Sequence, residues 1–482
     1  NIDLINHNGK KITGAILEIN NHQADGFVYL PDSLSSGFYL LNASTRTDKI
    51  FISKELYIAN RFTGLPESNS DLQPSAIVPL NETAAQNIQV DGVENQYKPR
   101  QKGHASIQLP AELIPRIDGE LSVSIAGVIK EFSTPQFLRK SESETSQTIA
   151  KEGITIDGIV TDIRTAKPFN KAIVYLSIPD SIPGFQYFIT SEDGHFSFQL
   201  GKYYGKIPVV IQCFAKEKSA LLKITLNDRD NLKNELPAFV PRTFTPEFKK
   251  SVEKITDAVT YRKIFNQQEI VIQPAPIIKR DTYPYYGVPT KTFDPQLFID
   301  LPNFNEISKE LLSGVKFRNY NRIPTLQVYN VAQQLFFNDQ PLLLLDGIPI
   351  RDLNVIKDMG TKDIDKVEVC QNERFYGDLI FPGVVAIYTS KADYTRVPES
   401  NDLIKLNLEV IQPHAILNIP AEQPLNDPDL RQVLLWKPTL KPEPKMELDF
   451  QTSDISGSFK LSIRGKTKDG SIFNKEQIFE VN

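Results

Sequence analysis

The chain has 482 residues, of which 40% are hydrophobic and 23% are charged, and its formal net charge is −5. This length exceeds what one hydrophobic core supports, so we expect roughly three to five domains. The negative charge argues against nucleic acid or an anionic membrane as the main partner. No apolar run approaches the roughly 20 residues of a membrane-spanning helix. The 33 Pro, 28 Phe and 17 Tyr, with short alternating apolar runs, predict a mainly β, multi-domain protein of serial β-sandwiches plus one small α+β domain.

Residues 1–65 are predicted to form the first β-sandwich. Its short apolar runs are separated by Asn8-Gly9 and by Pro31-Asp32-Ser33, which have the chemistry of turns. Because the chain opens directly on the apolar stretch Ile2–Ile5, we expect that a natural start is missing, and a signal peptide or a lipid anchor would belong to it.

Residues 71–135 are predicted to form a second sandwich, since polar and apolar residues alternate in Ala105–Leu109 and in Gly119–Ile125. The polar, Ser- and Thr-rich residues 136–150 are typical of a flexible linker. A third sandwich is expected over residues 153–225.

In this third sandwich, Asp193-Gly194 predicts a hairpin turn, and Phe196 and Phe198 are expected on one face of a strand. The next segment, residues 245–296, begins with a predicted helix. Thr245 can cap this helix, Pro246 suits its first position, and apolar residues recur at helical spacing. They are Phe248, Val252, Ile255 and Val259.

The second half of that segment is rich in Pro and Tyr and includes Tyr283, Tyr285 and Tyr286. We expect it to run extended along a surface. An aromatic segment of this kind wraps either another domain or a partner, and the sequence does not distinguish the two.

Residues 300–395 are predicted to form the α+β domain. A helix over Phe304–Lys316 precedes the apolar run Leu342–Leu345, which is closed by Asp346-Gly347. Asp346-Gly347 could be a contact loop or a hairpin turn that requires positive φ, and the second interpretation is favoured.

Further strands are expected in this domain at Ile348–Ile350, Lys366–Val369 and Val384–Tyr388, with a short helix over Leu353–Met359. Residues 400–482 are predicted to form a last, C-terminal sandwich, because Phe459, Leu461 and Ile463 alternate with polar residues.

Four spaced phrases in the α+β domain resemble the plug domain of TonB-dependent outer-membrane receptors. They are Pro341–Ile350, Ile364–Val369, Tyr376-Gly377 and Gly383–Thr389. A receptor plug lies inside a β-barrel that follows it, but the residues after Lys391 are too few to build a transmembrane barrel.

Three other parts of the chain resemble domains of bacterial envelope proteins. Gly26, Pro31, Gly37, Tyr39 and Thr45 resemble macroglobulin-type domains; Gly158, Asp162, Pro168, Asp193 and Gly194 resemble the carboxypeptidase regulatory-like domain; and Pro428–Trp436 with Thr452–Gly457 resembles the C-terminal domain of the same proteins. The set resembles a Bacteroidota envelope family that combines macroglobulin-type, regulatory-like and plug-like domains without a barrel.

This resemblance implies a non-enzymatic scaffold or accessory subunit, associated with the outer membrane at the cell surface or on the periplasmic side. The expected partner is an outer-membrane β-barrel protein or complex for transport, secretion or assembly. The alternative is a free ligand-binding module that holds a peptide or a glycan between the regulatory-like and plug-like domains. The residues expected to contact the partner are Asp346, Gly347, Ile348, Pro349, Tyr283, Tyr285 and Tyr286.

The remaining chemistry of the sequence is sparse. Its five His are scattered and match no metal-binding or catalytic spacing, so we expect no catalytic, cofactor or metal site. Cys213 and Cys370 are expected to be two buried thiols; the alternative is a disulfide between two domains, which nothing in the sequence supports. Asp-Ser-aliphatic sequences at Ser33 and Ser181 match the short sequence used for O-glycosylation in that bacterial group. So short a sequence also occurs often by chance at sites that are not modified.

Overall fold

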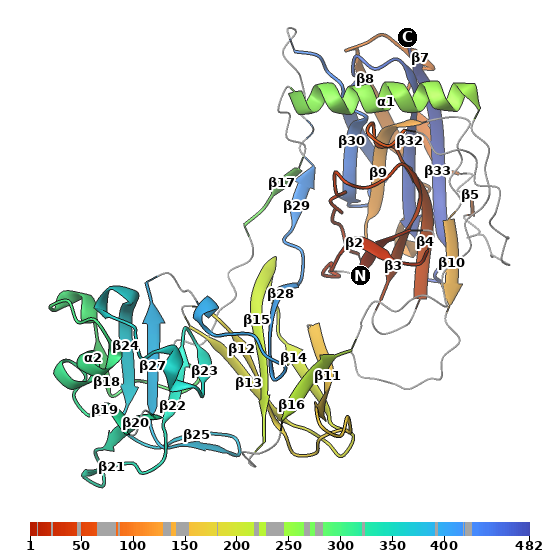
Figure 1. Cartoon of the computed structure of the whole chain (residues 1–482). Coiled ribbons are helices and arrows are strands. Elements are labelled where there is room, and N and C mark those ends of the chain that lie inside the picture. The colour runs from red at the N-terminus through yellow and green to blue at the C-terminus, as the bar shows by residue number, and fades with distance from the viewer. Residues whose placement is uncertain are drawn as a thin grey trace. The chain divides into compact units, whose positions relative to one another are not determined.

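The computed structural model describes the chain except for residues 7, 21–22, 46–49, 65–82, 85–86, 129–135, 141–153, 181, 216–220, 228–244, 265–269, 275–282, 321–322, 391–393, 418 and 420–426. The protein is mainly β and multi-domain, as predicted (Figure 1). Its contacts divide it into two units. The first unit comprises Asn1–Ala150, Asp230–Pro276 and Ile411–Asn482, and the second comprises Lys151–Arg229 and Ile277–Val410.

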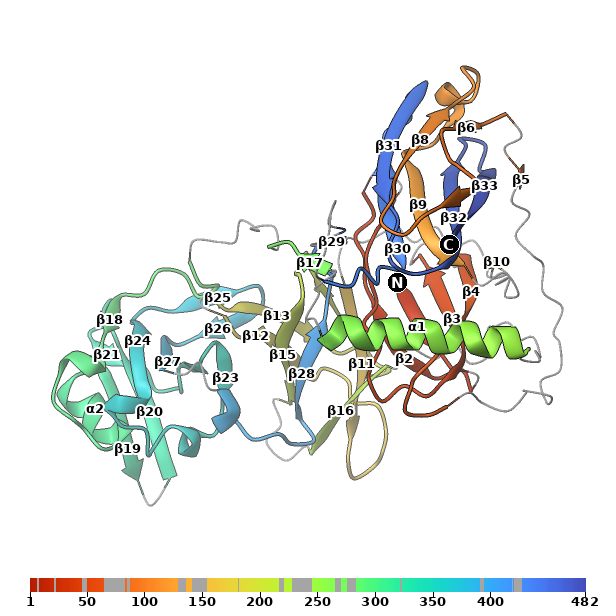
Figure 2. The same cartoon turned by 90° about the horizontal axis from the view of Figure 1, so that it is seen from above.

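The first unit contains a five-stranded antiparallel sheet rather than a closed N-terminal sandwich. Its strand order is β10 (Gln136–Lys140), β4 (Ile50–Ile58), β3 (Gly37–Ser44), β1 (Ile2–Ile5) and β2 (Lys11–Ala15). The start of the predicted linker is therefore a strand, because β10 pairs with β4 along its whole length. Helix α1 (Pro246–Ile264) lies against β4 (Figure 2), where the rings of Phe248 and Tyr57 are 5.3 Å apart.

The β-sandwich of the first unit is built from both ends of the chain. One sheet has the order β30 (Val433–Leu440), β9 (Leu121–Val128), β32 (Gly457–Lys466), β33 (Ile472–Val481) and β5 (Thr83–Ala84), and β7 (Gln96–Tyr97) also pairs with β33. The other sheet has the order β31 (Lys445–Gln451), β8 (Lys102–Gln108) and β6 (Gln89–Asp91).

The two sheets share one hydrophobic core, to which both ends contribute Ile107, Ile125, Phe459 and Phe479. In Figure 1 the orange strand β9 lies between the blue strands β30 and β32. Strands from the predicted sandwich 71–135 and strands β30–β33 from the predicted sandwich 400–482 therefore belong to one sandwich, whereas Leu403–Glu409, in the second range, pairs within the second unit. A short ribbon of β17 (Ile270–Ile272) and β29 (Ala415–Leu417) and the 3-10 turn η1 (Ile114–Arg116) complete this unit.

The sandwich of the second unit also includes a strand that is distant from the others in the sequence. One sheet has the order β14 (His195–Leu200), β11 (Ile154–Asp162) and β16 (Leu222–Leu226). The other has the order β13 (Gly184–Ile189), β12 (Ile173–Ile178), β15 (Lys206–Phe214) and β28 (Leu403–Glu409). Since β28 follows the plug-like domain in the chain, that domain is an insertion within the sandwich. Phe196 and Phe198 are buried on one face of β14, as predicted.

The plug-like domain has a mixed sheet in the order β18 (Lys291–Phe293), β24 (Ile364–Cys370), β27 (Val384–Thr389), β22 (Leu342–Leu345) and β23 (Ile348–Ile350). Strands β22 and β27 are parallel, which explains why β22 is one continuous apolar run: it is buried on both faces. The ribbon of β19 (Val315–Tyr320), β20 (Ile323–Asn330) and β21 (Leu335–Phe336) flanks this sheet, as does the hairpin of β25 (Arg374–Tyr376) and β26 (Leu379–Phe381).

Helical structure in this domain is shorter than predicted. Helix α2 covers Phe304–Glu310, where the Asn303 side chain caps it by accepting a 3.0 Å hydrogen bond from the Glu306 N–H. In place of the expected helix over Leu353–Met359 there is only η3 (Leu353–Val355). The other 3-10 turns are η2 (Pro295–Leu297), η4 (Thr361–Asp363) and η5 (Tyr394–Arg396). No helix among the described residues has the length and apolar content needed to cross a membrane.

Candidate functional site: the junction of the sandwich and the plug-like domain

The predicted contact loop Asp346-Gly347 is the two-residue turn that joins β22 and β23. Leu345 and Ile348 are paired across it, and both turn residues have positive φ, 49° and 84°. These angles match the type I′ turn, which favours Asp-Gly. Asp346 is only 5% exposed, and its carboxylate accepts hydrogen bonds of 2.8 Å from the Thr389 N–H and from the Thr389 hydroxyl. The geometry therefore agrees with the hairpin interpretation.

The turn and the strand after it face the sandwich of the same unit. A side chain at Gly347 would collide with Pro183, and the carbonyl of Pro349 accepts a 3.0 Å hydrogen bond from the Gln212 side chain. Ile348 is fully buried. The stretch Asp346–Pro349 thus forms part of the junction between plug-like domain and sandwich and offers no free surface to a second protein.

The Pro/Tyr-rich segment wraps its own chain in the same place. The ring of Tyr285 stacks on Phe185 of the sandwich, with centroids 4.3 Å apart and planes at 11°. Tyr286 is 3% exposed and donates a 2.6 Å hydrogen bond to the Glu368 carboxylate; its oxygen also lies 2.6 Å from the Tyr388 hydroxyl. Tyr283, in contrast, is 56% exposed.

Burial raises the pKa of the hydroxyls of Tyr285 and Tyr286. For Tyr286, the contacts with Glu368 and Tyr388 raise the pKa further, so this hydroxyl stays protonated and donates. The Tyr285 hydroxyl is buried and has no hydrogen-bond partner among the described residues. Tyr286 thus holds the segment by hydrogen bonds, whereas Tyr285 contributes only apolar packing of its ring.

The hairpin of β25 and β26 closes the junction from the plug-like side (Figure 2). The Tyr376 hydroxyl donates a 2.8 Å hydrogen bond to the Phe185 carbonyl, and the Asp378 N–H donates a 2.9 Å hydrogen bond to the Tyr187 hydroxyl. The junction is filled by rings from the sandwich, the Pro/Tyr-rich segment and the hairpin: Tyr175, Phe185, Tyr187, Phe214, Tyr285 and Tyr376. The predicted ligand space between the two domains is therefore occupied by these side chains.

The outer face of the same hairpin is apolar and open. Phe375 and Ile380 are directly paired across the strands and are 66% and 61% exposed. Arg374, which alternates with Phe375 and so lies on the opposite face of β25, donates a 2.6 Å hydrogen bond to the Val288 carbonyl and fixes the base of the hairpin. We call Phe375 and Ile380 the hairpin patch. Sequence reasoning missed this patch, although the alternation of Phe375 with Tyr376 was a signal that one of them faces outward.

The structure describes one of the two candidate residues for O-glycosylation. Ser33 is exposed in the turn that precedes β3, so its hydroxyl is accessible. Ser181 lies outside the described residues.

The two thiols behave as expected. Cys213 and Cys370 are both free and buried. Burial raises the pKa of both thiols, that of Cys213 to about 12, so neither is a ready nucleophile or metal ligand. Among the described residues, no group of three or more His, Cys, Asp or Glu side chains is arranged to hold a metal ion.

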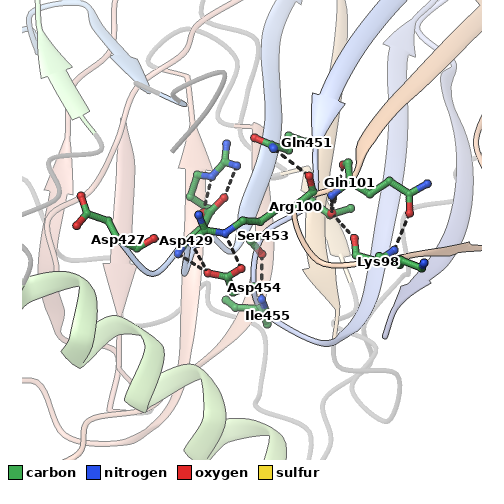
Figure 3. A network of polar contacts seen from close by, with 11 residues as sticks. Lys98, Arg100, Gln101, Asp427, Asp429, Gln451, Ser453, Asp454 and Ile455 are labelled. Atoms are coloured by element: carbon green, nitrogen blue, oxygen red, sulfur yellow. Dashed lines mark hydrogen bonds and ion pairs between the residues drawn. The ribbon is translucent and has the colours of Figure 1, made fainter. Parts of the chain in front are cut away.

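A polar network in the first unit explains the C-terminal phrases singled out in the sequence (Figure 3). The guanidinium of Arg100 makes two hydrogen bonds, of 2.8 and 2.7 Å, to the Asp454 carboxylate. Asp454 also accepts a 2.7 Å hydrogen bond from the Asp429 N–H, and Asp429 is paired with buried Arg431 at 2.6 Å. Arg100 thereby lowers the pKa of Asp454. The network joins the N-terminal and C-terminal strands that build the sandwich. Its role is therefore structural.

Comparisons with known proteins leave the family of this chain open. No family model matches the chain, and no curated protein matches it. Among solved structures, one titled as a tetra-tandem repeat in the extending region of a large adhesion protein covers 100% of this chain and 91% of its own. Its TM-score is 0.11 and its sequence identity is 8%, values at which similarity carries no argument about fold or function.

Proposed function

We propose that this protein is a non-enzymatic scaffold or accessory subunit of the bacterial cell envelope, which binds an outer-membrane β-barrel protein or complex through its plug-like and sandwich domains. The observation that supports this proposal best is the aromatic junction of the second unit. This junction joins two domains by extensive packing. One resembles a receptor plug, and the other is a sandwich that resembles a structural module.

The surface that this body offers to a partner is the hairpin patch. Large apolar side chains in a cross-strand pair, fixed by a hairpin whose other face is packed, are suited to become the buried centre of a protein interface. The patch replaces Asp346–Pro349, Tyr285 and Tyr286 as the expected contact, because those residues are used inside the chain. Tyr283 stays in the expected contact region because it is exposed.

The experiment is affinity purification of the tagged full-length protein from detergent-solubilised native membranes, followed by mass spectrometry. Recovery of an outer-membrane barrel in stoichiometric amount supports the proposal and names the machine. Recovery of the protein alone, outside the membrane fraction, contradicts it.

Two variants locate the contact. In the double variant Phe375→Ser, Ile380→Ser we expect recovery of the barrel to fall at least about tenfold, as for loss of a buried interface centre. The matched control is Ile323→Ser on β20, where the side chain is 66% exposed but lies outside the hairpin patch. Equal loss in both variants would show that the effect is not specific to the patch.

A further inference from the structure

The turn that follows edge strand β18 places three consecutive large apolar side chains in water. Leu297, Phe298 and Ile299 are 78%, 56% and 74% exposed. Single exposed apolar residues are common on protein surfaces, whereas a contiguous group indicates a contact with something apolar. We call these three residues the apolar turn.

The apolar turn is held firmly on its N-terminal side. Pro295 is buried, and the Asp294 carboxylate accepts a 3.2 Å hydrogen bond from the Gln296 N–H. The Gln296 side chain donates hydrogen bonds of 2.9 Å to Asp365 and to Ser390. The residues before the turn are therefore fixed to the plug-like domain.

The C-terminal side is fixed in the same manner. Leu301 is 7% exposed; its N–H donates a 3.2 Å hydrogen bond to the Thr361 hydroxyl, and its carbonyl accepts a 3.0 Å hydrogen bond from the Thr361 N–H. Because both sides are anchored, the turn cannot fold back to bury its own side chains.

The backbone shows what kind of surface could cover the apolar turn. Phe298 has φ −114° and ψ −175°, which is extended backbone, and successive side chains of an extended segment point to opposite sides. Phe298 and Ile299 are nevertheless both exposed, so the segment projects from the domain with neither side covered. A flat protein surface would cover one side only, whereas a fluid lipid phase surrounds a projecting segment.

The charges around the turn indicate which headgroups the lipid surface should carry. Asp294 and Asp300 flank the apolar residues, and residues 294–300 contain no Lys or Arg. Asp300 is paired with Lys362, which lowers the pKa of the carboxyl and balances its charge. The net negative charge at the turn therefore comes from Asp294 and from Asp365, which accepts the hydrogen bond of Gln296. An anionic headgroup layer would repel these carboxylates, so a neutral or zwitterionic surface fits better.

We infer that the apolar turn inserts into the boundary between headgroups and acyl chains of a lipid layer with neutral or zwitterionic headgroups. The inference does not depend on the proposed partner, since it concerns a different face and a different class of contact. Three side chains make a weak anchor by themselves, because stable attachment takes at least two signals. The turn would therefore orient a protein that is held at the membrane by another contact.

The test uses the full chain tethered by a terminal hexahistidine tag to phosphatidylcholine vesicles that carry a few nickel-chelating lipids. The chain has one Trp, so Trp436→Phe provides a dark background for the reporter substitution Phe298→Trp. Brominated acyl chains then report whether the reporter enters the lipid. The control reporter is Phe375→Trp in the same background, also in the second unit and similarly exposed.

We expect the Phe298→Trp emission to shift to the blue and to be quenched at least about twofold more than the Phe375→Trp emission. Adding Leu297→Ser and Ile299→Ser should remove this difference, while thermal unfolding shows that the variants remain folded. Equal quenching of the two reporters, or no quenching of either, would overturn the inference. Quenching that requires phosphatidylglycerol in the vesicles would overturn the assignment of a neutral surface.

Discussion

Two neighbouring Tyr residues at the junction differ in whether their buried hydroxyl is hydrogen-bonded. Tyr285 buries a hydroxyl that has no partner among the described residues, while the hydroxyl of Tyr286 bonds to buried Glu368. An unpartnered buried hydroxyl lowers stability, whereas a hydrogen bond to a charged group raises it. The same chemical change should therefore have opposite effects at the two positions.

We predict that Tyr285→Phe leaves stability unchanged or raises the free energy of unfolding by up to about 1 kcal/mol, and that Tyr286→Phe lowers it by about 1–3 kcal/mol. Each variant serves as the control for the other, since both remove one hydroxyl from adjacent rings. Chemical denaturation followed by circular dichroism measures the two changes. Equal destabilisation would contradict the assigned roles.

His104 on β8 is a residue whose protonation is coupled to folding. Its two ring nitrogens lie 2.7 Å from the carboxylates of Asp449 and Glu447 on β31, and these contacts raise the pKa of the imidazole. A pKa raised by folding gives stability that is fully present below the unfolded value of about 6.5 and is lost as the pH rises through the folded value.

We therefore expect the pH titration of His104, followed by NMR of its ring protons, to have its midpoint above about 6.5. Asp449→Asn should move this midpoint down, because Asp449 is the largest cause of the shift. A midpoint that does not move would show that the contact does not persist in solution.

At the scale of single elements, the β22–β23 hairpin packs so closely on the sandwich that its turn tolerates no added atom. Gly347 combines positive φ with contact to Pro183. We predict that Gly347→Ala lowers the free energy of unfolding of the second unit by more than about 1 kcal/mol. Gly201→Ala is the matched control, since nothing lies within 4 Å of its added Cβ. Differential scanning calorimetry of the two variants should separate them, and equal melting temperatures would contradict the close packing.

The elements that the sequence predicts well are those specified by neighbouring residues. The strands β22, β24 and β27 and the Asp346-Gly347 turn could be inferred because alternation, apolar runs and turn chemistry are local. The partners of each strand could not be inferred in this way. Alternation in Gly119–Ile125 shows that β9 has a core face, but it does not show that β32 supplies the neighbouring strand.

The candidate site was harder to predict for the same reason. A Pro/Tyr-rich segment has the same composition whether it packs on its own chain or on a partner, so Tyr285 and Tyr286 could not be assigned in advance. Asp346-Gly347 also suits both an exposed loop and a buried turn. Burial against Pro183 and Gln212 decided the matter, and those residues lie more than a hundred positions away in the sequence.

At the scale of the whole molecule, the chain is nested rather than serial. The plug-like domain is inserted before β28 of the second unit's sandwich, and the two segments of the second unit alternate along the chain with the three segments of the first unit. A C-terminal deletion should therefore damage the fold near the N-terminus. It removes β30–β33 and exposes the core residues Ile107 and Ile125 on β8 and β9.

We predict that a chain ending at residue 410 binds the dye ANS and loses amide protection in β8 and β9. Amides of β12 and β15 in the second unit should stay protected, which hydrogen exchange with mass spectrometry can measure in one experiment. Adding residues 411–482 as a separate polypeptide should restore protection of β9. Full protection of β8 and β9 in the shortened chain would contradict the shared sandwich.

The pairing of β8 with β31 also sets a schedule for biosynthesis. His104 and Asp449 are 345 residues apart, and a ribosome that adds about 5–20 residues per second needs roughly 20 to 70 s to make the intervening chain. During that interval β8 and β9 have been synthesised, but the strands that cover them do not yet exist. The early part of the nascent chain is thus a natural client for chaperones, and the last strands to be made decide when it is released.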